Sequence, residues 1–143
     1  MNVWDSEESL AAFIRGFEDG TYPKAQWTHQ AHVVMAAHYL TLHPVAEATR
    51  IVRERIPAYN VAQGGANTAD SGYHETLTVF WIAVVAAFLA AQADGTPRLA
   101  MIRAVAERYA GESRLHQRYY GYNVMADARA RRDWVPPPAW EKS

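Results

Sequence analysis

Apolar residues recur at every third or fourth position along most of the chain, which places them on one face of an α-helix. No segment shows the strict alternation of apolar and polar residues that is typical of a half-buried strand. Glycine, proline and polar residues separate the periodic stretches. We therefore expect helices over residues 5–20, 28–43, 45–56, 72–93 and 97–110, followed by shorter helical pieces.

Residue types at the ends of these stretches support the assignment. Asp5 or Ser6 can cap the first helix, and Gly20 can end it. Thr28 is a suitable N-cap for the second helix. Pro57 is expected to end the third helix, because a proline inside a helix removes one backbone hydrogen bond and clashes with the preceding turn.

Residues 57–71 have no helical period and predict a long loop, which could act as a lid. The run VFWIAVVAAFLAA that follows is interpreted as a central buried helix. It is shorter than the roughly 20 residues that span a bilayer, so a membrane partner is not expected. The sequence thus predicts an all-α fold, a single domain over residues 1–143 built as a bundle of five to seven helices.

Prolines near the C-terminus predict an extended tail that Trp134 and Trp140 hold against the body. The same two side chains and Trp4 could instead cover a dimer face. A homodimer is therefore an alternative to burial within one chain.

The amino-acid composition limits which partners and which metal ligands the chain can have. The formal net charge is −1, and basic residues do not form a stripe that could follow phosphates, so nucleic acid is not an expected partner. The chain has no cysteine, which leaves histidine and carboxylates as the strong metal ligands and is consistent with a cytoplasmic location. The acidic first residues do not resemble a secretory signal.

Histidines stand at the starts of two of the expected helices. If consecutive helices pack antiparallel, the second and fourth helices begin at the same end of the bundle, where His29, His32 and His74 become neighbours. The same reasoning brings the segment after the fifth helix, with His116, Tyr119 and Tyr120, to that end.

A metal site is the first interpretation of this cluster. His29 and His32 are separated by one helical turn, and with His74 they would offer three nitrogens to one divalent transition metal such as iron, zinc, manganese, nickel or copper. The expected function is then a small metal-dependent enzyme that acts on a small organic molecule. Glu75 is expected to assist beside the metal or to act as a general base, and His116 or Tyr120 could also handle protons. HETLT lacks the second histidine of a zinc-protease motif, so a protease is not indicated.

Two other interpretations need no metal. Glu75, His116 and Tyr120 could move protons to and from a small organic substrate, as in an isomerase or lyase. Alternatively, the domain only binds a ligand or a partner helix, and loop carbonyls satisfy the histidines. The expected walls of a substrate pocket are Trp27, Tyr73, Thr78, Trp81 and Tyr119.

Three segments together, WTHQAHVVMAAHYL, GYHETLTVFW and ARARRDWVPPP, are similar to those of an uncharacterised family of small bacterial helical proteins. That family shares an aromatic-Thr-His-x-x-His segment, a Tyr-His-x-Thr-x-Thr segment and an Ala-Arg…Pro ending. The resemblance covers residues 17–138 and implies that His29, His32 and His74, with Thr76 and Thr78, belong to one site. It implies no particular reaction.

Overall fold

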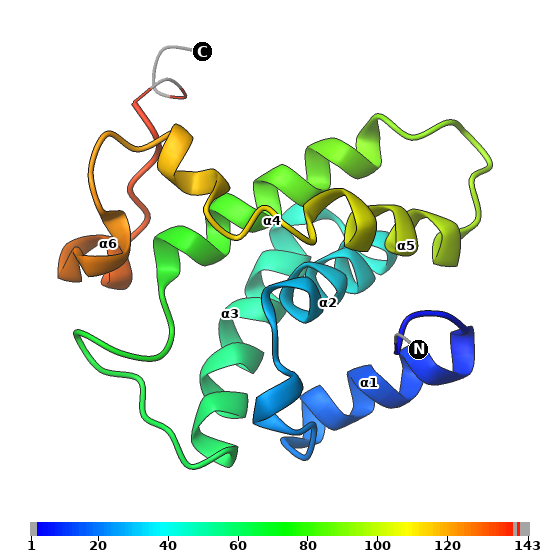
Figure 1. The fold of residues 1–143 in the computed structure, drawn as a ribbon, viewed down its shortest axis with the longest axis horizontal. Coiled ribbons are helices and arrows are strands. Elements are labelled where there is room, and N and C mark those ends of the chain that lie inside the picture. Colours follow the sequence, from blue (N-terminus) through cyan, green and yellow to red (C-terminus); the bar gives the residue numbers. More distant parts are fainter. Residues whose placement is uncertain (1–2, 139, 141–143) are drawn as a thin grey trace.

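A computed structural model describes residues 3–138 and 140, and within them the chain is helical, with no strand (Figure 1). This confirms the all-α bundle. The six α-helices are α1 (Glu7–Asp19), α2 (His29–Leu42), α3 (Val45–Ala62), α4 (Glu75–Ala90), α5 (Arg98–Tyr109) and α6 (Ala128–Arg132). The three short 3₁₀ helices are η1 (Lys24–Gln26), η2 (Leu115–Arg118) and η3 (Val124–Ala126).

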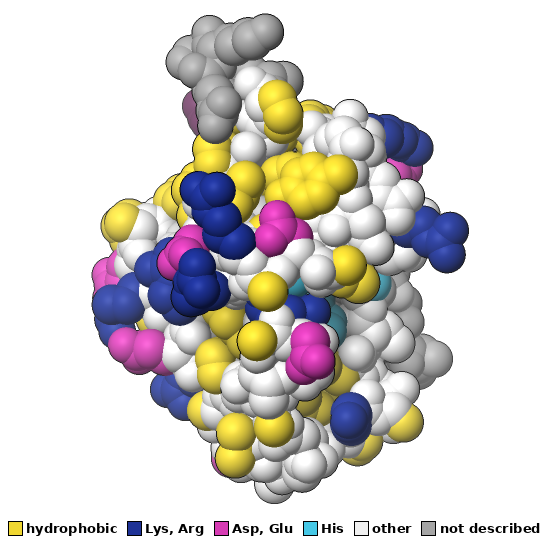
Figure 2. Space-filling view, turned by 90° about the vertical axis from the view of Figure 1, so that its left-hand side faces the viewer, with side chains coloured by type: hydrophobic (Ala, Val, Ile, Leu, Met, Phe, Trp, Pro, Cys, Tyr) yellow, Lys and Arg dark blue, Asp and Glu magenta, His cyan; other side chains and the backbone are white. Residues whose placement is uncertain are grey.

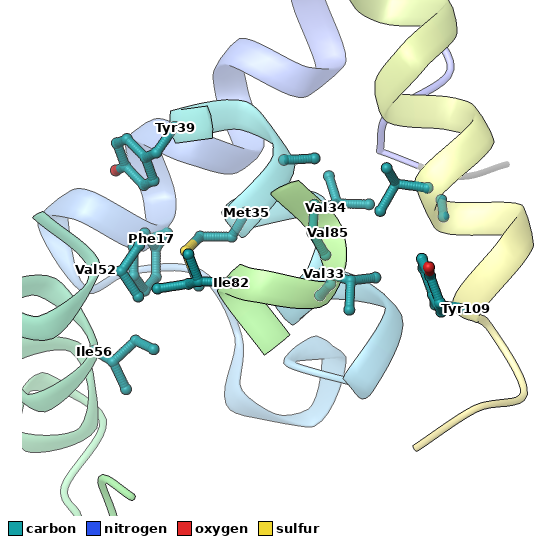
Figure 3. Close-up of a cluster of buried hydrophobic side chains, with 14 of the residues drawn as sticks. Phe17, Val33, Val34, Met35, Tyr39, Val52, Ile56, Ile82, Val85 and Tyr109 are labelled. Carbon is teal, nitrogen blue, oxygen red and sulfur yellow. The ribbon is translucent and has the colours of Figure 1, made fainter. Parts of the chain in front are cut away.

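Helix α2 lies at the centre and packs against α3, α4 and α5 (Figures 1 and 3). The four consecutive residues Val33, Val34, Met35 and Ala36 are at most 4% exposed, and together they point to all sides of the helix. A helix that is apolar on all sides is stable only when neighbours cover it. Helix α4 is more apolar than α2 but keeps part of its surface exposed, so α2 is the most deeply buried element.

The predicted helix ends at α1 and α2 are confirmed. Ser6 caps α1 through a reciprocal bond with Ser9, and Gly20 ends the helix in the left-handed conformation. A Cβ atom at Gly20 would collide with Ala62, so glycine is required there for two reasons. Thr28 caps α2 by accepting a hydrogen bond from the backbone N–H of Ala31.

The prediction that Pro57 ends α3 is wrong, because the helix continues to Ala62. The added turn buries Tyr59, whose hydroxyl donates to the carbonyl of Tyr22 at 2.6 Å. The carbonyl of Pro57 also accepts a hydrogen bond from the side chain of Asn67. These tertiary contacts outweigh the cost of a proline inside the helix.

Helix α4 begins later than expected, at Glu75, and its N-cap is His74. The preceding loop is ordered by Asn67, whose side chain bonds both Pro57 and the backbone N–H of Tyr73. In the described part of the chain, no helix is long and apolar enough to cross a membrane.

The C-terminal tail crosses the start of α4. The buried hydroxyl of Thr76 donates to the carbonyl of Asp133 at 2.7 Å and accepts the N–H of Val135 at 2.9 Å. Trp140 stacks on Phe80 with ring centroids 5.5 Å apart. All three tryptophans considered for a dimer face have contacts within the chain, since Trp4 is buried and the ring of Trp134 lies 6.1 Å from that of Trp140.

Candidate functional site

A cavity of about 450 Å³ opens at the end of the bundle where α2 and α4 begin. Gly72, Ser113 and Met125 are exposed and form part of its rim. Figure 2 shows histidine atoms recessed between other side chains on the face where α3, α4 and α6 meet. The four histidines that line the cavity are His29, His32, His74 and His116, the set that antiparallel helix packing predicted to be neighbours.

His74 is engaged by the protein on both ring nitrogens. Nδ1 accepts the backbone N–H of Leu77 at 3.2 Å, which caps α4, and Nε2 donates to the carbonyl of Val124 at 3.0 Å. Burial lowers the pKa of the ring, so it is neutral at pH 7. In this arrangement His74 has no free lone pair for a metal ion.

His32 lies one turn into α2 and is held from two sides. Its Nδ1 donates to the carbonyl of Thr28 at 2.6 Å, and its ring packs on Trp27 with centroids 4.0 Å apart. Because Nδ1 carries the proton, Nε2 keeps a lone pair. Desolvation lowers the pKa to about 4.

His29 and His116 have the least satisfied nitrogens of the site. His29 Nε2 and His116 Nδ1 are buried and have no hydrogen-bond partner among the described residues. Burial is the largest cause of a lowered pKa in both rings, while backbone carbonyls of Tyr109 and Ser113 oppose it. Trp81 packs edge-on against His29, with centroids 4.6 Å apart, and fixes the position of that ring.

Four of the five expected wall residues line the cavity, namely Trp27, Tyr73, Thr78 and Trp81. The hydroxyl of Thr78 donates to the carbonyl of His74, so it is already satisfied. Tyr119 is not among the lining residues; it is 38% exposed and packs against Phe80 and Trp140.

Glu75 and Tyr120, which the sequence suggested as catalytic, have structural partners instead. The carboxylate of Glu75 accepts hydrogen bonds from Arg53 at 2.7–3.1 Å and from the hydroxyl of Tyr73 at 2.6 Å. The hydroxyl of Tyr120 donates to the tail carbonyl of Val135. Neither residue lines the cavity.

The ligand geometry does not favour the predicted metal site. Within residues 3–138 and 140, no three His, Asp or Glu side chains are grouped so that they could hold one ion. His74 is unsuitable because the helix end and η3 use both of its nitrogens. His29, His32 and His116 have nitrogens without a protein partner or with a free lone pair.

Several lining residues were not anticipated from the sequence. Asn60 lies in the part of α3 that continues past Pro57, and Ser113 and Met125 lie in short segments with no helical period. For Ser113 and Met125, the sequence offered one signal: both lie near His116, in the part of the chain that antiparallel packing brings to this end of the bundle. Asn60 gave none, because the sequence placed it in a loop.

Comparison with known proteins adds no identification, since no family model, curated protein or solved structure matches this chain.

Proposed function

We propose that this protein is a small-molecule enzyme that catalyses proton transfer, of the isomerase or lyase kind, through the imidazoles of His29 and His116. The main support is that both rings have a buried, unpartnered nitrogen and line the same cavity. A buried polar atom without a partner costs about 1–3 kcal/mol. Native proteins contain few such atoms, and a ligand or a catalytic role is one of the established reasons for them.

The chemistry needs no co-reactant in the isomerase case. A neutral imidazole accepts a proton from one atom of the substrate, and the resulting imidazolium returns it to a second atom. The other imidazole, in the tautomer with the proton on its free nitrogen, donates a hydrogen bond to the oxygen on which negative charge develops. The lowered pKa values of both rings keep them in the neutral form that this cycle starts from.

A metal-dependent enzyme is the second candidate, because of the arrangement at His32. Its Nδ1–H bonds a backbone carbonyl, which orients Nε2 outward in the manner common to metal-ligating histidines. Binding one ion with His29 and His116 would require these rings to move closer together. Elemental analysis of untagged protein and of His29→Ala tests this candidate, which predicts near-stoichiometric metal that the variant loses.

The proton-transfer proposal is tested by enzyme-dependent deuterium incorporation. Uncharged hydroxylated ketones and aldehydes of one or two rings are incubated with the protein in deuterium oxide, and exchange at carbon is followed by NMR. Replacing His116 with Gln is expected to lower the exchange rate by about 10²-fold or more. His43→Gln is the matched control, since His43 lies at the opposite end of α2 and does not line the cavity.

Equal rates for wild type and both cavity variants, His29→Gln and His116→Gln, would rule out the two imidazoles as the proton-transfer groups. Circular dichroism of each variant establishes that the fold is retained. A rate that falls only after removal of a stoichiometric metal would instead favour the metal-dependent candidate.

A further inference from the structure

The residues that line the cavity include no aspartate, glutamate, lysine or arginine among those described. Glu75, which follows the cap residue of α4, has its carboxylate bound by Arg53 and by the hydroxyl of Tyr73. Its charge is therefore balanced outside the cavity. A charged ligand would lose its hydration on entering and meet no opposite charge, which is costly in a protein interior.

Neutral imidazoles supply much of the polar lining of the cavity, beside the side chains of Asn60 and Ser113. His29 Nε2 and His116 Nδ1 have no hydrogen-bond partner among the described residues and are almost fully buried, so a ligand bonds to them when the rings turn toward the cavity. Each nitrogen is a donor or an acceptor according to the tautomer of its ring. A hydroxyl group complements either form, because it both donates and accepts hydrogen bonds.

The walls are mainly aromatic and aliphatic. Trp27 and Trp81 contact the histidine rings, while Val52, Ile56 and Leu77 add an aliphatic surface. A volume of about 450 Å³ is in the lower part of the range for small-molecule pockets. Such a space suits an apolar body of one or two rings.

From these three observations we infer the substrate class: an uncharged molecule with an apolar body of one or two rings and one or two hydroxyl groups that bind His29 and His116. This inference rests on the proposed function, because it takes the cavity to be the substrate site. Carboxylates, phosphates and ammonium compounds are not expected as substrates, because the cavity lining has no opposite charge to pair with them.

Direct binding to the intact protein tests the inference without requiring turnover. Four probes share one naphthalene ring and one substitution position: naphthalenemethanol, naphthoate, naphthylmethylammonium and methylnaphthalene. Calorimetry at neutral pH is expected to give the tightest binding for naphthalenemethanol. Methylnaphthalene, which lacks the hydroxyl, is expected to bind about 10-fold more weakly, and the two ions about 10²-fold more weakly.

The variant His116→Phe keeps an aromatic ring at this position but removes the nitrogens, so it tests whether binding depends on hydrogen bonds to the imidazole. It should bind methylnaphthalene at least as well as naphthalenemethanol, whereas His43→Phe should retain the wild-type order. Resonances of the ring of His29 in the same titrations show whether the probe enters the cavity. They also provide a readout if the His116 variant does not fold.

Binding of naphthoate or naphthylmethylammonium as tight as that of the alcohol overturns the inference. So does the absence of alcohol binding by folded wild-type protein. These results differ from those that would overturn the proposed function. If the probes bind in the expected order but no deuterium exchange occurs, the proposed function fails and the ligand class stands. If a charged substrate shows exchange that depends on His116, the ligand class fails and the proposed function stands.

Discussion

Nε2 of His74 lies 3.0 Å from the carbonyl oxygen of Val124, fifty residues later in the chain, and this hydrogen bond fixes the tautomer of the ring. A carbonyl oxygen only accepts, so Nε2 must carry the proton and Nδ1 must be the acceptor that caps α4. One side chain thus joins the start of α4 to η3. The residue thus has a structural role in the cavity wall.

Replacing His74 with Ala is expected to destabilise the protein by about 2–3 kcal/mol, because the helix loses its cap and the carbonyl of Val124 loses its donor. His74→Asn should be less harmful, since asparagine is among the best N-cap residues. Urea denaturation measures both effects. Equal stability of His74→Ala and wild type would contradict the assigned role.

Stability is expected to fall as the pH decreases from about 7.5 to about 5. The folded-state pKa of His32 is about 4, whereas the unfolded value is 6.5, so between these values the unfolded chain binds more protons. The stability contributed by the neutral ring is complete above 6.5 and is lost as the pH falls toward 4. His32 alone should contribute about 1–2 kcal/mol of this loss by about pH 5.

The pH effect is checked by urea midpoints measured across that range. His32→Gln should reduce the slope of stability against pH. An unaltered slope in the His32 variant would show that the other histidines with lowered pKa values, His29, His38, His74 and His116, account for the pH dependence.

Thr76→Val should release the tail from α4. The substitution keeps the shape of a fully buried side chain but removes the hydroxyl that bonds Asp133 and Val135, so a loss of about 1–3 kcal/mol is expected. Hydrogen exchange at Val135 should become faster. Thr49→Val is the control, because its exposed hydroxyl bonds only a carbonyl of its own helix and the change should have little effect.

Glu75→Gln distinguishes a positioning role from direct catalysis. The carboxylate holds the cavity residue Tyr73 and pairs with Arg53, so the variant should weaken ligand binding by less than about 10-fold. A general base would instead lose about 10²–10⁴-fold in rate with little change in binding. Separate measurements of KM and kcat decide between the two roles.

Local signals in the sequence predicted much of the fold. The period of apolar residues identified five of the six α-helices, and Thr28 and Gly20 marked helix ends because their roles depend only on nearby backbone groups. The order of the helices then correctly brought His29 and His116 to one cavity. Short elements such as α6 had too few residues for a reliable period.

Residue spacing is least informative where tertiary contacts decide the outcome. Pro57 is accommodated inside α3 because Tyr59 and Asn67 find partners beyond the helix. His74 was expected to face an ion, but its backbone is extended and its ring caps the helix. The hydroxyl of Tyr120 is bound by the tail. None of these partners can be recognised from residue spacing alone.

The cavity walls come from four separate stretches of chain: the start of α2, the middle of α3, the start of α4, and the segments that follow α5. The pocket therefore exists only when all of these stretches are packed together. A ligand that fits it binds only the completed molecule, so it should act as a reporter of full assembly and shift the melting of all the helices together.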